Sequence, residues 1–304
     1  MLREKIRMLR RIFITPDNIN GDTISIDEKS AHHIFNVLRL GAGDRFLALD
    51  GQGCEYEAEI SDIRQRHAVI VSKSLQRSQV STKMNLYLSI IKQPRFEWAL
   101  EKCTELGISS FTPVKTERSI PVEFTENKIR RMNTIIEQSA EQSSRAILPI
   151  MHYELTLKQA LEQAQSKGII LIADLNESDI RLSQIFCDRH FFCDRSSRII
   201  SASFPCRRES RKYADVPAFA GTNSDGNPTK NVTNEKHDCR AFQACNDINI
   251  FIGPEGGFTV DEIELAKKYG ALSVCICENI LRSETAAISM CAIVKYLLKE
   301  SPNE

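Results

Sequence analysis

The chain has 304 residues, 42% of them hydrophobic, and its 40 basic and 40 acidic side chains cancel to a formal net charge of zero. This balance excludes a strong overall field as a guide to function, so a nucleic-acid partner has to be inferred from motifs. No apolar run is long enough to span a membrane, and the first residues lack the apolar core of a signal peptide. We therefore expect a soluble cytoplasmic protein with no membrane partner, whose ten cysteines are reduced thiols.

The first segment, residues 8–75, predicts a small β-barrel. Short strand-like runs (IFIT, TISI, RFLALD, EYEAEI and HAVIVSK) are separated by the turn sequences GDT, GAGD and DGQG. One helical patch, SAHHIFNVLRL, interrupts this pattern. Ser30 is expected to cap that helix, and Ile34, Val37 and Leu38 are expected to share its apolar face.

Residues 83–304 follow a different pattern. The buried-looking strands LYLSII, GIILIAD, IFIG and SVCIC alternate with amphipathic helices. Such alternation predicts an α/β domain with a mostly parallel sheet that is covered by helices. The helix PRFEWALEKCTELG is expected to begin near Pro94 and to end at Gly107, with an apolar stripe between them.

Residues 186–246 fit neither pattern, and they carry five of the ten cysteines together with the polar stretch GTNSDGNPTKNVTNEKHD. A zinc site is one interpretation. Its candidate ligands are Cys187, His190, Cys193, Cys206, His237, Cys239 and Cys245. Because the close ligand spacing of zinc knuckles is missing, we favour an inserted, disordered segment and predict no metal site.

The stretch IFIGPEGGFTVDEI, residues 250–263, joins a strand end to a glycine-rich turn and a helix start. Open α/β sheets bind ligands at such places, because backbone N–H groups and the helix dipole are free there. Glu255 would repel a phosphate, and no phosphate-binding motif is present, so a neutral or cationic ligand is favoured. The alternative is that the glycines only make a tight connection between strand and helix.

Two further features of this stretch bear on its role. Gly253, Gly256 and Gly257 allow a close approach of the backbone or a positive φ. Thr259 and Glu262 have the spacing of a capping box, which predicts where the next helix begins.

A second loop, ENILRSETAAI at residues 278–288, follows the next strand and again precedes a helix. Both loops are therefore expected at one edge of the parallel sheet, where they would form a cleft. Arg282 and Glu284 lie in the second loop. Their alternative interpretation is an exposed ion pair that contributes little stability.

Together, GPEGGFTVDEI and ILRSETAAI strongly resemble the signature pair of the ribosomal RNA small subunit methyltransferase E family, a member of the SPOUT superfamily. The family's N-terminal PUA-like domain is resembled by AHHIFNVLRLGAGDRF. The entry to its catalytic domain is resembled by FEWALEKCTELGISSFTPVKTERS, and its glutamine-rich helix is resembled by IIEQSAEQSSRAILP. The resemblance implies a trefoil-knotted α/β domain after a PUA-like β-barrel, and a homodimer. It also implies S-adenosyl-L-methionine as cofactor and methylation of N3 of a specific uridine in small-subunit (16S) ribosomal RNA, free or in an assembled 30S particle.

The resemblance also implies roles for single residues. The cofactor would contact Ile252, Gly253, Glu255, Gly256, Gly257, Ile280 and Leu281. Arg282 would stabilise negative charge on the uracil, and Glu284 would be the base or would orient Arg282. RNA would be contacted by Arg39, Lys92, Arg95, Arg118 and Arg145. Glu141, Gln142 and Arg145 also match a family motif near the subunit contact, so a structural role is the alternative for these three residues.

The chain departs from the family pattern in two places. Cys277 stands where many members have a glycine before the second signature, and Glu278 and Asn279 follow it, a change expected to bear on one wall of the cofactor pocket. The insert separates Asp174 from the strand that leads to Gly253. Three rival functions stay open: a catalytically silent RNA-binding protein of the same fold, a knotted methyltransferase with another RNA target, and a nucleotide-binding α/β protein. The last is disfavoured by the missing phosphate motifs.

Overall fold

The computed structural model describes residues 9–75, 82–174, 182 and 247–300, and all structural statements below concern these residues. The segment expected to be an insert, with its candidate zinc ligands, lies outside them. Among the described residues, no group of three or more His, Cys, Asp or Glu is placed to hold a metal ion. In the same part of the chain, no helix is long and apolar enough to cross a membrane.

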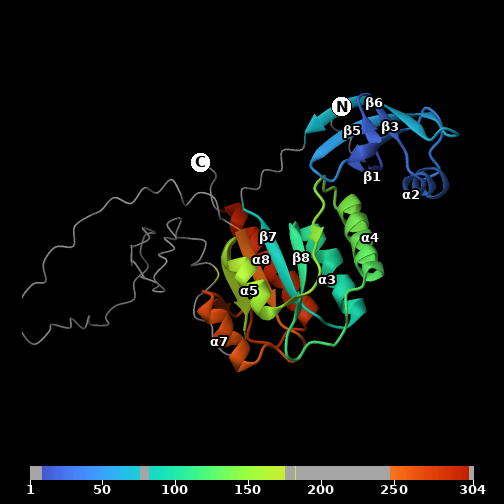
Figure 1. Ribbon diagram of the computed structural model, residues 1–304. Coiled ribbons are helices and arrows are strands. Elements are labelled where there is room, and N and C mark those ends of the chain that lie inside the picture. Colours follow the sequence, from blue (N-terminus) through green and yellow to red (C-terminus); the bar gives the residue numbers. More distant parts are fainter. Residues whose placement is uncertain (1–8, 76–81, 175–181, 183–246, 301–304) are drawn as a thin grey trace, which may run out of the picture. The chain divides into compact units, whose positions relative to one another are not determined.

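The N-terminal part is a six-stranded sheet in the order β1-β4-β5-β6-β3-β2 (Figure 1). Its strands are β1 Arg11–Phe13, β2 Ile19–Asn20, β3 Thr23–Ser25, β4 Arg45–Leu49, β5 Cys54–Asp62 and β6 His67–Leu75. Only the pair β1–β4 is parallel within this sheet. Side chains such as Ile24, Ile34 and Phe46, each with no exposed surface, fill its core.

The helical patch of this part differs from the prediction. Asp27, not Ser30, caps α2 (Glu28–Ala31), because Asp27 Oδ1 accepts a 2.7 Å hydrogen bond from the backbone N–H of Ser30. The chain then continues as the π-helix η2 (His32–Val37). Its wider turn breaks the 3.6-residue period, so Val37 is 56% exposed while Ile34 is fully buried.

The second part is a seven-stranded sheet in the order β10-β8-β7-β12-β11-β13, with β9 paired to β8. Its strands are β7 Met84–Ser89, β8 Ser110–Lys115, β9 Ile150–Met151, β10 Leu155–Thr156, β11 Gly168–Ala173, β12 Asp247–Ile252 and β13 Leu272–Val274. Every pair of strands described in this sheet is parallel, as the alternating pattern predicted.

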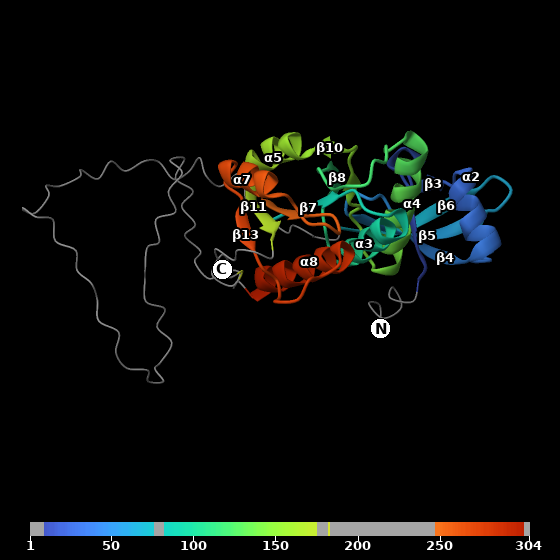
Figure 2. The ribbon, with the colours of Figure 1, turned by 90° about the horizontal axis from the view of Figure 1, so that it is seen from below.

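Helices cover both faces of this sheet (Figure 2). The helices are α3 Gln93–Leu106, α4 Glu126–Gln142, α5 Leu157–Gln165, α7 Val260–Lys268 and α8 Ser283–Glu300. Successive residues of a strand point to opposite faces. Thus Ile250 packs in the core with α3, α4 and α8, while Phe251 packs with α5 and α7 and stacks on Tyr87 at 4.4 Å between ring centroids.

Buried polar groups fix the register of the central strands. Asn85 on β7 donates to Asn249 on β12 at 3.1 Å and accepts a 2.7 Å bond from the Ser110 hydroxyl on β8. The amide of Asn249 also donates to the carbonyls of Ala164 and Ile169. A slip of one residue would leave these buried groups unpaired, so the network favours a single register.

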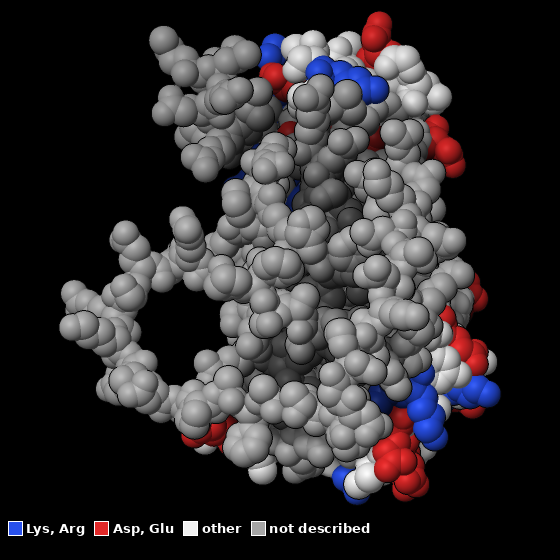
Figure 3. Space-filling model, turned by 90° about the vertical axis from the view of Figure 1, so that its left-hand side faces the viewer, with Lys and Arg blue, Asp and Glu red and all other residues white. Residues whose placement is uncertain are grey.

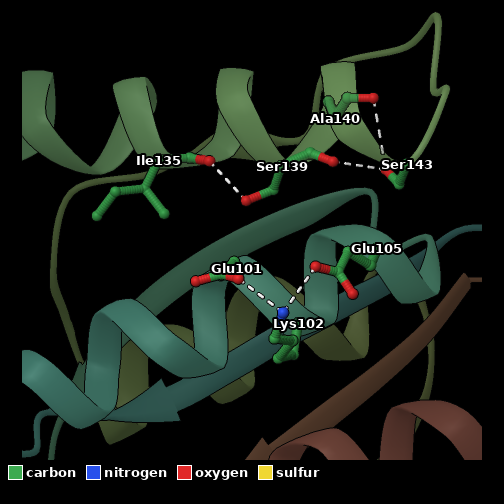
Figure 4. A network of polar contacts seen from close by, with 7 residues as sticks. All are labelled: Glu101, Lys102, Glu105, Ile135, Ser139, Ala140 and Ser143. Carbon is green, nitrogen blue, oxygen red and sulfur yellow. Dashed lines mark hydrogen bonds and ion pairs between the residues drawn. The ribbon is translucent and has the colours of Figure 1, made fainter.

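Helices α3 and α4, which pack against each other, end in different ways. Gly107 adopts a φ of +96° and terminates α3, as the sequence predicted. At the end of α4, the Ser143 hydroxyl donates to the carbonyls of Ser139 and Ala140 (Figure 4). Ser144 follows with a φ of +60°, so the chain turns sharply away from the helix axis at this point.

We expect Thr259→Ala to lower the free energy of unfolding by about 1 kcal/mol, because Thr259 caps α7 through its bond to the Glu262 N–H. Urea unfolding of the full chain measures this loss. The matched control is Thr134→Ala in the middle of α4, where the hydroxyl bonds only the Arg130 carbonyl. Equal losses in the two variants would contradict the capping role.

Candidate functional site

The loops that follow β12 and β13 meet the end of β11 and enclose a cavity, so the cleft predicted from the two loops is present. The strand order explains this arrangement, because β11 lies between β12 and β13 and all three run in parallel. The lining residues are Ala173, Asp174, Ile252, Gly253, Pro254, Glu255, Gly257, Val274, Ile276, Cys277, Asn279, Ile280, Leu281, Ser283 and Ala286.

The chemistry of this lining is apolar with two carboxylates. Ile252 and Val274 are buried strand ends that form apolar wall, whereas Asp174 and Glu255 are acidic. The described lining contains no Lys or Arg. Such a site favours an organic ligand with a neutral or positive charge over a phosphate.

The glycine turn has backbone requirements at two positions. Gly257 has a φ of +67°, and its N–H donates to the Pro254 carbonyl at 2.9 Å. A Cβ on Gly253 would lie 3.1 Å from the ring of Phe258 and 3.2 Å from its backbone nitrogen. The turn therefore brings backbone, not side chains, to this part of the cavity.

Helix α7 begins directly after the turn with the predicted capping box. The Thr259 N–H donates to Glu262 Oε2 at 2.9 Å, and the Glu262 N–H donates to Thr259 Oγ1 at 3.3 Å. Glu262 Oε1 also accepts a 2.8 Å bond from the Glu117 N–H in the loop after β8. One side chain thus starts the helix and holds a neighbouring loop beside it.

Gly256 was expected to contact the cofactor, but the structure places it outside the cavity lining and against Arg118. Its carbonyl accepts a 2.6 Å bond from Arg118 Nη1, and an added Cβ would lie 3.1 Å from Arg118 Cδ. Arg118 was expected at the RNA. Here it supports the outer side of the glycine turn.

Arg95, another residue expected at the RNA, connects the two loops of the cavity. Its Nη1 is 2.6 Å from Glu255 Oε1, and its Nε is 3.7 Å from Glu284 Oε1. The side chains of Arg95 and Glu255 are 34% and 37% exposed, so their pair adds little to stability. Its effect is positional, because it holds an acidic group of each loop near the N-terminus of α3.

Glu284 is not paired with Arg282, contrary to one role suggested by the sequence. Its side chain is only 6% exposed and faces Arg95, whereas Arg282 is exposed. Glu284 Oε2 and the Ser283 hydroxyl are buried and have no hydrogen-bond partner among the described residues. Their place in the first turn of α8 suits acceptors, because the helix dipole is positive there.

The loop where the chain departs from the family pattern is held by its own thiols. Cys275 Sγ donates to the Cys277 carbonyl at 3.1 Å, and Cys277 Sγ donates to the Asn279 carbonyl at 3.2 Å. Cys277 and Asn279 line the cavity, so the residues that depart from the family pattern form part of one wall. Ile280 also belongs to the lining but is 82% exposed, which places it at the rim.

Sequence reasoning missed several residues of the lining, above all Asp174 and Ser283. Asp174 follows β11 directly, and its N–H donates to the Val274 carbonyl at 3.1 Å. The rule that ligands bind beyond the carboxyl ends of parallel strands would have indicated this residue. Ser283 carried no comparable signal, since polar residues are common in loops.

Arg145 was expected to contact RNA, with a structural role as the alternative, and its guanidinium makes internal hydrogen bonds. Its Nη1 donates to the carbonyls of Thr104 and Ile108 at 2.7 and 2.9 Å. Burial lowers the pKa of Arg145 to about 10, which still leaves it charged at neutral pH. It ties the end of α4 to the turn between α3 and β8.

Of the other residues expected at the RNA, Arg39 and Lys92 are exposed. Arg39 has a φ of +57° just after η2, and Lys92 precedes α3. Where side chains are coloured in Figure 3, basic and acidic groups are interspersed. This mixing agrees with the neutral composition, and it means that RNA contacts have to be argued residue by residue.

The fold and the site define an α/β ligand-binding domain that follows a separate β-domain, and two family models describe this combination. The RNA methyltransferase domain model matches residues 78–190 and 215–295, and the RNA methyltransferase PUA domain model matches residues 26–74. Because the first model alone covers more than half of the sequence, the chain belongs to the RNA methyltransferase family.

Curated relatives are similar to this chain over most of its length. The Ribosomal RNA small subunit methyltransferase E of Synechocystis sp. is 26% identical over 96% of this chain and 79% of its own length. The protein of the same name from Rickettsia conorii is 27% identical over 94% of this chain and 95% of its own. The family resemblance recognised in the sequence is thus confirmed.

Solved structures support the fold. The Ribosomal RNA small subunit methyltransferase E of Neisseria gonorrhoeae, solved with S-adenosyl methionine bound, has a TM-score of 0.70 at 22% identity and covers 95% of this chain and 98% of its own. A Legionella pneumophila putative methyltransferase in complex with the same cofactor has a TM-score of 0.68 at 22% identity, over 95% and 97% of the two chains.

We expect Arg145→Gln to lower the free energy of unfolding by about 3 kcal/mol, because two buried carbonyls lose a charged donor. Arg130→Gln is the control, since Arg130 lies on the same stretch of chain but is exposed and pairs only with Glu126. Urea unfolding measures both variants. If the Arg145→Gln protein were as stable as the unaltered protein but bound RNA more weakly, the internal role of Arg145 would be contradicted and a role in RNA contact would be supported.

Proposed function

We propose that this protein transfers the methyl group of S-adenosyl-L-methionine to N3 of a specific uridine in small-subunit ribosomal RNA. The observation that carries the proposal is the cavity between the loops after β12 and β13, which is apolar and acidic in a chain of the RNA methyltransferase family. The two solved neighbours that hold S-adenosyl methionine support the choice of cofactor.

The residues of the cavity fit this cofactor. Apolar walls from Ile252, Val274 and Leu281 suit an adenine ring, and the turn at Gly253 and Gly257 lets backbone groups approach it. The sulfonium carries a positive charge and the molecule has no phosphate, which agrees with the carboxylates of Asp174 and Glu255. A pyrophosphate would meet repulsion at the same place.

The proposal includes the trefoil knot and the homodimer expected from the resemblance. In support of the knot, the loops after β12 and β13 meet around the end of β11, the strand that lies between them in the parallel sheet. The chain between Asp174 and Asp247, apart from Leu182, lies outside the described residues. We also propose that the substrate is small-subunit ribosomal RNA, either free or within an assembled 30S particle, and that the enzyme works in the cytoplasm.

The bound cofactor would supply an electrophilic methyl group, and the protein has to place the uracil in line with it and remove the N3 proton. We assign charge stabilisation to Arg282. Its exposed side chain extends from the start of α8, the helix whose first residues border the cavity. A guanidinium there would donate to a uracil carbonyl oxygen as negative charge develops after proton loss.

We assign Glu284 to the proton at N3. Arg95 lies against one carboxylate oxygen of Glu284, and the other oxygen has no partner within the described part of the chain. A uracil N3–H that approached this oxygen would find a buried acceptor already oriented. The same contact with Arg95 explains why Glu284 needs no contact with Arg282.

RNA contact would come from cations in both parts of the chain. Arg39 and Lys92 are exposed, whereas Arg95 and Arg118 already contact carboxylates or the glycine turn. We therefore propose that Lys92 and Arg39 contact phosphates, and that Arg95 and Arg118 act mainly on the loops. We therefore expect that removing the charges of Lys92 and Arg39 reduces the salt dependence of RNA binding more than removing those of Arg95 and Arg118.

We expect Arg282→Ala to reduce methyl transfer by about 100-fold or more, the range found when a preorganised donor is removed. The assay follows labelled methyl from S-adenosyl-L-methionine into small subunits that lack the modification, and nucleotide analysis of the product locates the methyl group. Arg130→Ala on the outside of α4 is the matched control and keeps full activity.

The outcomes of this assay separate the rival functions. Transfer to another nucleotide would support a methyltransferase with a different target. Binding of the subunit by the unaltered protein without any transfer would support the catalytically silent protein. Full activity of Arg282→Ala would remove Arg282 from the site.

Two carboxylates of the site are expected to respond differently. Glu284→Gln should lower kcat by about 100-fold or more with little change in cofactor affinity, because it removes the proton acceptor. Glu255→Gln should weaken cofactor binding several-fold with a smaller effect on kcat, because Glu255 is partly exposed and acts on the ligand's charge. Calorimetry and single-turnover rates distinguish the two, and identical profiles would contradict the separate roles.

A further inference from the structure

A second cavity lies in the β-domain and takes no part in the methyl-transfer site. Its volume is about 300 Å³, and it is lined by Ile19, Gly21, Asp22, Tyr56, Ile70 and Lys73. All six belong to β2, β5, β6 or the turn between β2 and β3. A cavity of this size accommodates a small organic group such as a purine ring.

The shape of the cavity depends on the β2–β3 turn. Gly21 has a φ of +57°, and no atom lies within 4 Å of the position a Cβ would take, so the wall is open at this residue. The Asp22 carbonyl accepts a 2.8 Å bond from the Ile70 N–H, and the Thr23 hydroxyl donates to the Asn20 carbonyl at 3.0 Å. The turn is thus held firmly against β6.

Most of the exposed lining is polar, and the apolar part that could contact a flat ring comes from Ile19, Ile70 and Tyr56. Ile19 and Ile70 are half-buried, and Tyr56 is 8% exposed with its ring in the core of the β-domain. Unpaired bases of RNA commonly bind between apolar and aromatic side chains, because stacking replaces the neighbours they have left.

Two opposite charges stand at the cavity. The Nζ of Lys73 lies 5.0 Å from the centroid of the Tyr56 ring. A hydrogen bond with the Tyr56 side chain raises the pKa of Lys73, so Lys73 stays a cation and donates hydrogen bonds only. Asp22, on the turn, is exposed to water, and its carboxylate is an acceptor of hydrogen bonds.

This combination discriminates among ligands. Asp22 would repel a bare phosphate, and Lys73 would repel a metal ion. Guanine alone among the four bases presents two adjacent donors, N1–H and the N2 amino group, beside the acceptor O6. Two donors match a carboxylate and the acceptor matches an ammonium group, whereas adenine offers an acceptor at N1 and no O6.

We propose that the cavity formed by Ile19, Gly21, Asp22, Tyr56, Ile70 and Lys73 binds one unpaired guanine of the RNA substrate. The proposal rests on the proposed function only in taking RNA as the ligand. It adds a second point of base recognition on the β-domain, separate from the reacting uridine. Such a contact would set which RNA segment the enzyme engages, while phosphate contacts supply affinity.

The test uses the full-length protein without cofactor and fluorescence anisotropy of labelled single-stranded pentaribonucleotides. The probes carry guanosine, inosine or adenosine at the centre of four uridines. We expect about tenfold tighter binding of the guanosine probe than of the adenosine probe, the discrimination typical of one bidentate base contact. Inosine, which lacks the N2 amino group, should fall between them.

Asp22→Asn and Lys73→Gln should each bring the ratio of the affinities for the guanosine and adenosine probes close to one. Each substitution removes one of the two charged groups that would recognise guanine. The control variants are Asp17→Asn and Arg64→Gln, which change exposed charges of the same β-domain outside the cavity lining and should leave the ratio unchanged. Equal binding of guanosine and adenosine probes would overturn the proposal, as would a ratio that survives Asp22→Asn.

Two further arms of the experiment test the nature of the ligand and the place where it binds. Guanosine monophosphate that displaces the guanosine probe as well as unlabelled probe RNA does would identify a free nucleotide as the ligand and overturn the RNA assignment. A probe with 6-thioguanosine at the centre should crosslink to peptides that contain residues 19–22, 54–56 or 70–73, and a crosslink elsewhere would overturn the site. None of these readouts needs methyl transfer, so failure of the proposed catalytic function would leave them interpretable.

Discussion

The parallel pairing of β12 between β7 and β11 is the constraint on which the site depends. Asn249 in the middle of β12 is fully buried and bonds to Asn85 and to the carbonyls of Ala164 and Ile169. These bonds hold β12 in one register, so that Ile252 ends the strand where β11 and β13 also end. Both loops of the cavity follow from this alignment, because parallel strands direct their carboxyl ends to one edge.

Local charge, not net charge, shapes the site. A chain with equal numbers of acidic and basic groups concentrates carboxylates at the cavity and places Arg95 and Arg118 just outside its lining. These arginines hold the loops through Glu255, Glu284 and the Gly256 carbonyl. Because a preorganised arrangement costs nothing at the moment of reaction, loop support of this kind would contribute to the proposed methyl transfer.

The local features of the fold were predictable from the sequence. The alternation of buried strands with amphipathic helices indicated the parallel sheet, and the spacing of Thr259 and Glu262 indicated the start of α7. The helical patch was predicted less well, because the π-turn of η2 breaks the period that placed Val37 on the apolar face. Asp27 displaced Ser30 as the cap, since both residue types suit that position and only the backbone path selects between them.

By itself the sequence determined the family, the class of each domain and the two loops that form the site, because these are encoded in short motifs and in local periodicity. Only the tertiary structure decided what individual charged residues do. Arg145 lies 41 residues from Thr104, and Arg95 lies 160 residues from Glu255, yet each pair is in direct contact. Burial and hydrogen-bond partners of this kind arise from packing between segments that are distant in the sequence. For this reason Arg145, expected at the RNA, makes internal hydrogen bonds, and Glu284, expected beside Arg282, lies beside Arg95.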